Sequence, residues 1–183
     1  VALAQSPGEA SAFGVYSSHI KREQFVADMG WTDEQYYEWA DAHMQTLGAH
    51  WTRVSLLLLW SIVEPNLGNP YNWNAPPGTP DTTLRAIYEP PNQIHCLAVI
   101  TPGMGPTTRN PVQYPNEWQA FVRAAAERYD GDGIDDADPN IRVNYFQLVN
   151  EDQDWRNLPF GTAGNYGQTA RLTLDALRSA NHN

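Results

Sequence analysis

A carboxyl-bearing residue, Glu151, closely follows an apolar run late in the chain. Residues 143–149 have the composition of a β-strand, and Asn150 and Glu151 come next. A carboxylic acid with a raised pKa can donate a proton to a departing oxygen near neutral pH and can then activate a water molecule. Glu151 is therefore the candidate general acid/base, and a solvated carboxylate at a strand end is the alternative interpretation.

Asn150 and Glu151 can act together only if the strand changes course at its end. Strict alternation of side chains in a β-strand would place these two neighbours on opposite faces of the sheet. Both reach one cleft only if the strand bends there. The sequence therefore predicts a break in the extended backbone next to Asn150.

Arg53 lies inside an otherwise apolar strand over residues 51–55. Its guanidinium is always charged, so burial requires a partner, which we expect to be a carboxylate. Alternation places Trp51, Arg53 and Ser55 on one face of the strand. Arg53 is therefore a candidate active-site residue, with a surface ion pair as the alternative.

The acidic turn over residues 130–138 has carboxylates at alternate positions, which suits a hard cation such as calcium. The spacing fails the EF-hand pattern, because Gly133 occupies the fourth loop position and no glutamate closes the loop. We expect a solvated turn with no bound metal, and calcium binding stays open as the alternative. No other pattern indicates a cofactor.

Short strand-like runs alternate with helical patterns along the chain. Such an alternation predicts βα units, a parallel sheet and, when about eight units follow one another, a closed (β/α)₈ barrel. The predicted fold class is α/β, a TIM barrel of which this chain holds about the first four βα units. Residues 1–11 form a tail and residues 12–183 form the half-barrel. The predicted strands cover residues 13–16, 51–55, 95–100 and 143–149.

The helices between these strands have recognisable ends and faces. Thr32 and Gln35 form a capping box that begins a helix, and Gly48 provides its left-handed end. A short helix is expected over residues 81–88, and Pro115 begins another. The buried faces of the last two helices are predicted to be Trp118, Phe121, Val122, Ala125 and Tyr129, and then Tyr166, Ala170, Leu174 and Leu177.

The stretch Tyr145-Phe146-Gln147-Leu148-Val149-Asn150-Glu151 resembles the fourth strand of clan A glycoside hydrolases, which are retaining (β/α)₈-barrel enzymes. The stretch Leu47-Gly48-Ala49-His50-Trp51-Thr52-Arg53-Val54, followed by Trp60 and Glu64-Pro65, resembles their second βα unit. The resemblance runs from Phe13 to about Ala180. The chain departs from the family at Asp152, where proline is common.

The resemblance implies that Glu151 is the acid/base for a β-linked oligo- or polysaccharide and that Arg53 supports the nucleophile. Asn150 would hydrogen-bond the sugar hydroxyl beside the anomeric carbon. Glu64 would belong to the structure of its loop rather than to catalysis. Further candidates for sugar binding follow strand ends, each with loop packing as the alternative: Tyr16, His19, Trp60 and Trp155.

The nucleophile is expected on a seventh strand, outside these four βα units, so residues 1–183 alone are expected to be inactive and to need a complementary half-barrel. That half would be the rest of a longer chain, a second chain or a second copy. Two other interpretations stay open: a carbohydrate-binding half-barrel that dimerises without hydrolysis, and an α/β interaction module with an accidental Asn-Glu match.

Composition narrows the classes of partner and location. Eleven Lys and Arg against 21 Asp and Glu give a net charge of −10, which disfavours nucleic acid. The single cysteine, Cys96, excludes an internal disulfide and a cysteine-based zinc cluster. No run approaches the ~18 apolar residues of a membrane span.

Ala2-Leu3-Ala4 resembles the end of a signal peptide, which predicts a secreted or periplasmic protein; a cloning or truncation boundary is the alternative interpretation.

Overall fold

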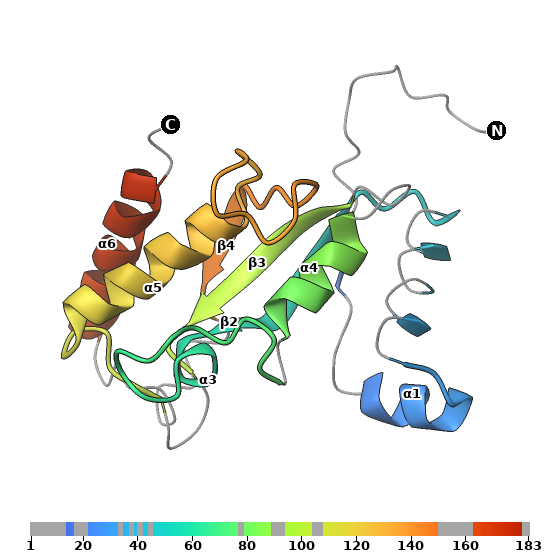
Figure 1. The fold of residues 1–183 in the computed structure, drawn as a ribbon, viewed down its shortest axis with the longest axis horizontal. Helices are drawn as coiled ribbons and strands as arrows, with labels where there is room; N and C mark the ends of the chain where they lie inside the picture. Colours follow the sequence, from blue (N-terminus) through green and yellow to red (C-terminus); the bar gives the residue numbers. More distant parts are fainter. Residues whose placement is uncertain are drawn as a thin grey trace.

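The fold is a mixed α/β arrangement in which four parallel strands form one sheet (Figure 1). The strands are β1 (Gly14–Tyr16), β2 (Trp51–Leu59), β3 (His95–Thr101) and β4 (Tyr145–Leu148). The computed structural model describes residues 14–16, 22–32, 35–36, 39, 42–43, 46–76, 79–88, 94–103, 108–149 and 163–180.

The strands lie in the order β1-β2-β3-β4, and every neighbouring pair is parallel. The four predicted strands and their parallel pairing are confirmed. Within the described residues the sheet is open, with β1 and β4 at its two edges, and a closed barrel is not confirmed. β2 is four residues longer than predicted, and its register against β3 shifts between Val54 and Leu58.

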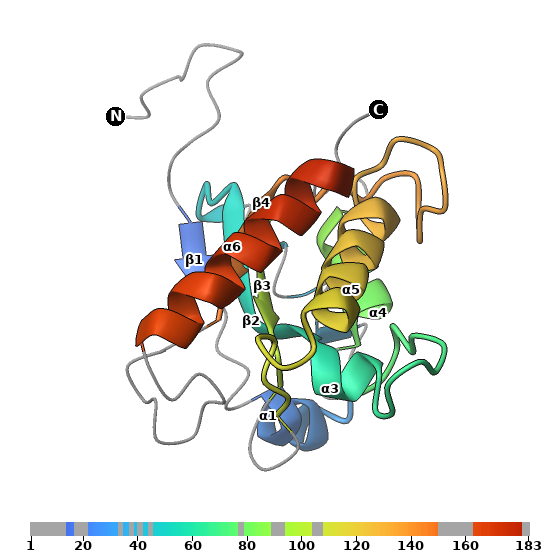
Figure 2. The ribbon, with the colours of Figure 1, turned by 90° about the vertical axis from the view of Figure 1, so that its left-hand side faces the viewer.

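Three of the described helices pack against one face of the sheet. They are α4 (Pro80–Tyr88), α5 (Pro115–Arg128) and α6 (Ala163–Ala180). Right-handed crossovers between consecutive parallel strands place successive helices on the same side. Figure 2 shows α5 and α6 side by side in front of the strands. The core between the layers includes Val54, Cys96, Ala98 and Ile100 from the sheet and Leu84, Ile87, Phe121 and Ala176 from the helices.

The helix that begins at Pro115 matches its prediction closely. Pro115 occupies the first turn of α5, where its missing N–H would have no helical partner in any case. All five residues of the predicted apolar stripe are buried, from Trp118 to Tyr129. The 3.6-residue period therefore identified the packed face correctly.

The buried face of α6 differs from its prediction. Leu174, expected to be buried, is 46% exposed, whereas Thr169, Thr173 and Ala176 are buried. The reason is the neighbouring helix: the indole Nε1 of Trp118 donates to Thr173 Oγ1 at 2.9 Å, so α6 turns a threonine-bearing face toward α5. The hydrogen bond between Trp118 and Thr173 therefore determines the buried face of α6, and the apolar periodicity does not.

The predicted end signals of the helical segment before β2 are confirmed. The backbone N–H of Gln35 donates to Thr32 Oγ1 at 3.2 Å, and the N–H of Thr32 donates to Gln35 Oε1 at 2.9 Å. Gly48 has φ +72°. Two helices were not predicted: α1 (Arg22–Met29) and the single turn α3 (Trp60–Val63), which follows β2 directly.

Gly103, just after β3, lies close against the Ser61 side chain. Its φ is +147°, and an added Cβ would clash with the Ser61 side chain and lie 3.3 Å from the Cα of Thr108. We expect Gly103→Ala to lower the free energy of unfolding by at least about 1–3 kcal/mol, since the substitution combines an unfavourable φ with a steric clash.

Urea unfolding measures how much of the loss comes from the clash, when the free energies of unfolding of Gly103→Ala and Gly133→Ala are compared. Gly133 also has a positive φ, +98°, but a Cβ added there would meet nothing within 4 Å. Gly133→Ala should therefore cost less. Equal losses in the two variants would contradict a packing role for Gly103.

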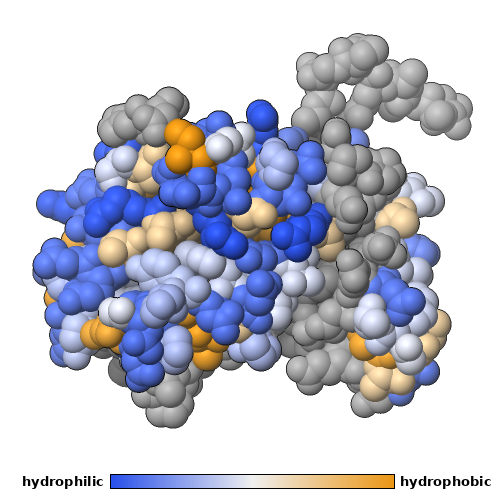
Figure 3. Space-filling view, in the orientation of Figure 1, coloured by the Kyte–Doolittle hydropathy of each residue, from blue (hydrophilic) through white to orange (hydrophobic). Residues whose placement is uncertain are grey.

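The surface over α4 and α5 is mainly hydrophilic (Figure 3). Among the described residues, no helix combines the length and the apolar character needed to cross a bilayer.

Candidate functional site

The face of the sheet opposite the helices presents polar and aromatic side chains. Alternate residues of β2 and β3 are buried against the helices, whereas Trp51, Arg53, His95 and Leu97 are only partly buried. Trp51 and Arg53 therefore share the open face, as predicted. On β4 the register places Tyr145 and Gln147 beside Leu97 and Val99 of the same face.

Arg53 is connected across this face to β4. Its Nε donates to Gln147 Oε1 at 2.8 Å, although β3 lies between the two strands. The prediction gave Arg53 a carboxylate partner; among the described residues, Arg53 is hydrogen-bonded to the neutral amide of Gln147. The sequence carried a signal for Gln147 that was overlooked: it is a polar residue within an apolar strand.

The amino ends of the strands carry an aromatic cluster on the same face. The ring of Trp51 lies 4.9 Å from that of His95 and 4.8 Å from that of Tyr145, measured between centroids. These three residues are the first of β2, β3 and β4. The cluster therefore lies at the end of the sheet opposite to the carboxyl ends, where reacting groups of βα barrels are found.

The extended backbone of β4 ends abruptly at Val149. This residue has φ +51°, which is rare for a β-branched side chain, and it is 3% exposed. Its N–H donates to the carbonyl of Ile100 at 2.9 Å, and its own carbonyl accepts from Gln147 Nε2 at 2.7 Å. The predicted break in the strand is found here, immediately before Asn150.

The predicted catalytic and sugar-binding residues divide into two groups. Arg53 is on the open face, and the backbone of Tyr16 pairs with Arg53 in the register of β1 and β2. The predictions for His19, Asn150, Glu151 and Trp155 concern positions outside the described residues.

Trp60 is placed differently from its prediction as a sugar-binding residue. The side chain is fully buried, it packs edge-on against Trp118, and its Nε1 donates to Glu64 Oε2 at 2.7 Å. A sugar has no exposed ring face to stack on. Trp60 holds the loop after β2 in place, which was the alternative interpretation.

Glu64 is a structural residue, as predicted. It is 4% exposed, and its second oxygen, Oε1, accepts the backbone N–H of Gly68 at 2.7 Å. Arg109, from the loop after β3, lies over the Trp60 ring and donates to the carbonyl of Pro65. Sequence reasoning did not identify Arg109, which ties together the loops that follow β2 and β3.

Asp81, at the start of α4, centres a buried polar cluster. Its carboxylate accepts two hydrogen bonds from Arg128, at 2.8 and 2.7 Å, and one from the Tyr129 hydroxyl at 2.8 Å. Burial alone would raise the pKa of Asp81, but the hydrogen bonds from Arg128 and Tyr129 outweigh it and hold the pKa below its ordinary value. The cluster joins α4 to α5 away from the open face.

The acidic turn brings three carboxylates together. One oxygen each from Asp130, Asp132 and Asp136 lies within 4.8 Å of the others. Asp136 accepts the N–H groups of Gly131 and Gly133 at 3.0 and 2.7 Å. Hydrogen bonding within the turn accounts for this arrangement, and exposed acidic clusters of this kind are common without an ion.

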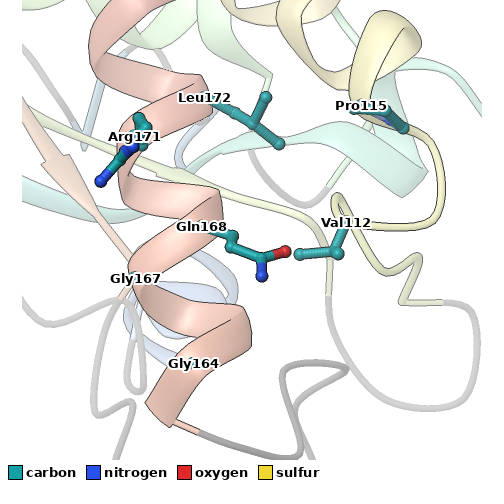
Figure 4. Close-up of a pocket in the computed structure, with 7 residues that line it drawn as sticks. All are labelled: Val112, Pro115, Gly164, Gly167, Gln168, Arg171 and Leu172. Carbon is teal, nitrogen blue, oxygen red and sulfur yellow. The ribbon is translucent and has the colours of Figure 1, made fainter.

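A cavity of about 660 Å³ lies between the first turns of α5 and α6 (Figure 4). In Figure 4 the side chains of Val112 and Gln168 point toward each other across it, and Arg171 lies on the far side of its helix. Arg53 and Trp60, the predicted site residues whose side chains the structure describes, are not among the residues that line it. The described residues that line it are Val112, Pro115, Gly164, Gly167, Gln168, Arg171 and Leu172.

Comparison of the chain with protein-family models, curated proteins and solved structures finds no match.

Proposed function

We propose that these four βα units belong to a (β/α)₈-barrel glycoside hydrolase that cleaves β-linked glycosides with retention of configuration. The sequential strand order supports this proposal. In doubly wound α/β folds the strand order reverses and helices cover both faces. Here the order runs β1 to β4 without reversal, and the helices α4 to α6 pack on one face.

The open face supports the same architecture. Its aromatic and polar side chains include Tyr145, which is 51% exposed. In a closed barrel such inward-pointing residues are covered by the remaining strands. The proposal therefore includes a complementary half, from a longer chain, a second chain or a second copy, which would also carry the nucleophile.

The observation that carries the functional proposal is the left-handed backbone of Val149. A catalytic carboxylate at the end of strand four must be turned toward the cleft together with the asparagine before it, and regular alternation would prevent this. The break at Val149, immediately before Asn150 and Glu151, is the departure from regular alternation that the proposal requires.

In the proposed mechanism Glu151 protonates the glycosidic oxygen while a second carboxylate, about 5 Å away, attacks the anomeric carbon. Glu151 then removes a proton from water, which releases the sugar from the covalent intermediate. Asn150 would hydrogen-bond the neighbouring hydroxyl, and Arg53 would support the attacking carboxylate. The substrate class is a β-linked oligo- or polysaccharide, which would be met outside the cytoplasm.

A screen of the complete protein against activated aryl β-glycosides and β-linked polysaccharides tests the proposal. We expect hydrolysis of at least one substrate, and loss of polysaccharide hydrolysis in Glu151→Gln. Activity that is unaffected by Glu151→Gln, or the absence of hydrolysis across the panel, would refute it.

A further inference from the structure

Gln147 is the residue that joins Arg53 to the turn at the end of β4. Its side chain uses both ends of its amide: Oε1 accepts from Arg53 Nε at 2.8 Å, and Nε2 donates to the Val149 carbonyl at 2.7 Å. Both distances are those of good hydrogen bonds. A single side chain therefore contacts an active-site candidate and the backbone that precedes Glu151.

The conformation at Val149 needs support from its surroundings. A left-handed, β-branched residue is strained by about 1–3 kcal/mol and persists only where neighbouring contacts fix it. Two such contacts are present: the N–H of Val149 donates to Ile100 on β3, and its carbonyl accepts from Gln147. The first contact anchors the residue to the sheet, and the second fixes the peptide plane that leads to Asn150.

We propose that Gln147 is a positioning residue: it locks the left-handed turn at Val149 and couples it to Arg53, so that Glu151 is aimed at the substrate. This inference rests on the proposed function for the role of Glu151. It assigns Gln147 no contact with the substrate. Its two bonds have different tasks, because the acceptor oxygen orients Arg53 and the donor nitrogen holds the turn.

Two substitutions in the complete protein test these bonds. Gln147→Glu keeps an acceptor for Arg53 but cannot donate to the Val149 carbonyl, whereas Gln147→Met removes both bonds at similar size. A misplaced catalytic group costs up to about 100-fold in rate. We expect both variants to lower kcat about 10- to 100-fold for glycosides with poor leaving groups, with much smaller losses for activated aryl glycosides and little change in KM.

The matched control is Gln119→Met. Gln119 also donates its Nε2 to a backbone carbonyl, that of Leu172 at 3.3 Å, but it does so between α5 and α6. This variant should keep the wild-type dependence on the leaving group. Crystal structures of the Gln147 variants supply a readout that does not depend on activity: Val149 should lose its positive φ.

The outcomes are distinct. If Glu151→Gln impairs hydrolysis but Gln147→Glu and Gln147→Met act on both substrate classes as wild type does, the positioning role is wrong and the proposed function survives. A uniform loss on both classes, with φ of Val149 unchanged, would also overturn it. If Glu151→Gln has no effect, the proposed function itself fails.

Discussion

Replacing Glu151 with Gln in the complete protein is expected to lower kcat for unactivated β-glycosides by about 10²- to 10⁴-fold, with little change in KM. The amide has nearly the shape of the acid but has no acidic proton for the departing oxygen. Substrates with good leaving groups need no such proton, so their first step should continue. The covalent intermediate should then accumulate, because its hydrolysis lacks a general base.

Pre-steady-state kinetics with an activated aryl glycoside measure this directly. A burst of released phenol followed by slow turnover is expected, and azide, a nucleophile that needs no general base, should restore turnover and give a β-glycosyl azide. Glu117→Gln, on the outer helix α5, is the control and should behave as wild type. Equal losses on both kinds of substrate, or no response to azide, would refute the acid/base role.

Replacing Asp81 with Asn should produce the largest loss of stability among single conservative substitutions in the described structure. It removes the negative charge that pairs with Arg128. Breaking a buried ion pair typically costs about 3–5 kcal/mol. The Arg128 side chain is 29% exposed, so solvent screening reduces the expected loss of unfolding free energy to about 2–4 kcal/mol.

The same substitution should change the dependence of stability on pH. The folded-state pKa of Asp81 is below its ordinary value, because the hydrogen bonds from Arg128 and Tyr129 outweigh the effect of burial. The stabilisation is therefore complete above about pH 4, the unfolded value, and is lost as pH falls through the lowered folded pKa. The wild-type advantage over Asp81→Asn should shrink in that acidic range.

Urea denaturation at neutral pH and at pH values below about 4 tests both parts of this prediction. Arg85→Met is the control, since its ion pair with Asp138 joins side chains that are 49% and 22% exposed. That variant should lose less than about 1 kcal/mol. A similar loss in Arg85→Met and Asp81→Asn, or a pH-independent difference from wild type, would contradict the account.

The sequence predicted best where a local rule alone determines the structure. The capping box at Thr32 and Gln35, the left-handed Gly48 and the buried stripe of α5 depend on neighbouring residues or on one helical period, and all three are confirmed. The parallel strands follow from their alternation with helices. The break before Asn150 was predictable because regular alternation conflicts with the proposed chemistry.

Predictions from the sequence were wrong or incomplete where contacts between residues far apart in the chain determine the placement of a side chain. The face of α6 is set by the bond from Trp118 to Thr173, residues 55 positions apart, and apolar periodicity cannot reveal it. Trp60 followed a strand, which suggested a binding residue, but the turn α3 directs its ring into the core. The pairing of Arg53 with Gln147 spans 94 positions and depends on the register of three strands.

The stereochemistry of the first product tests the central claim most directly. Proton NMR of the complete protein acting on a β-linked substrate distinguishes the two anomers before they interconvert. Double displacement through Glu151 and a second carboxylate predicts the β-anomer as the first product. Initial release of the α-anomer would show inversion and would contradict the proposed mechanism.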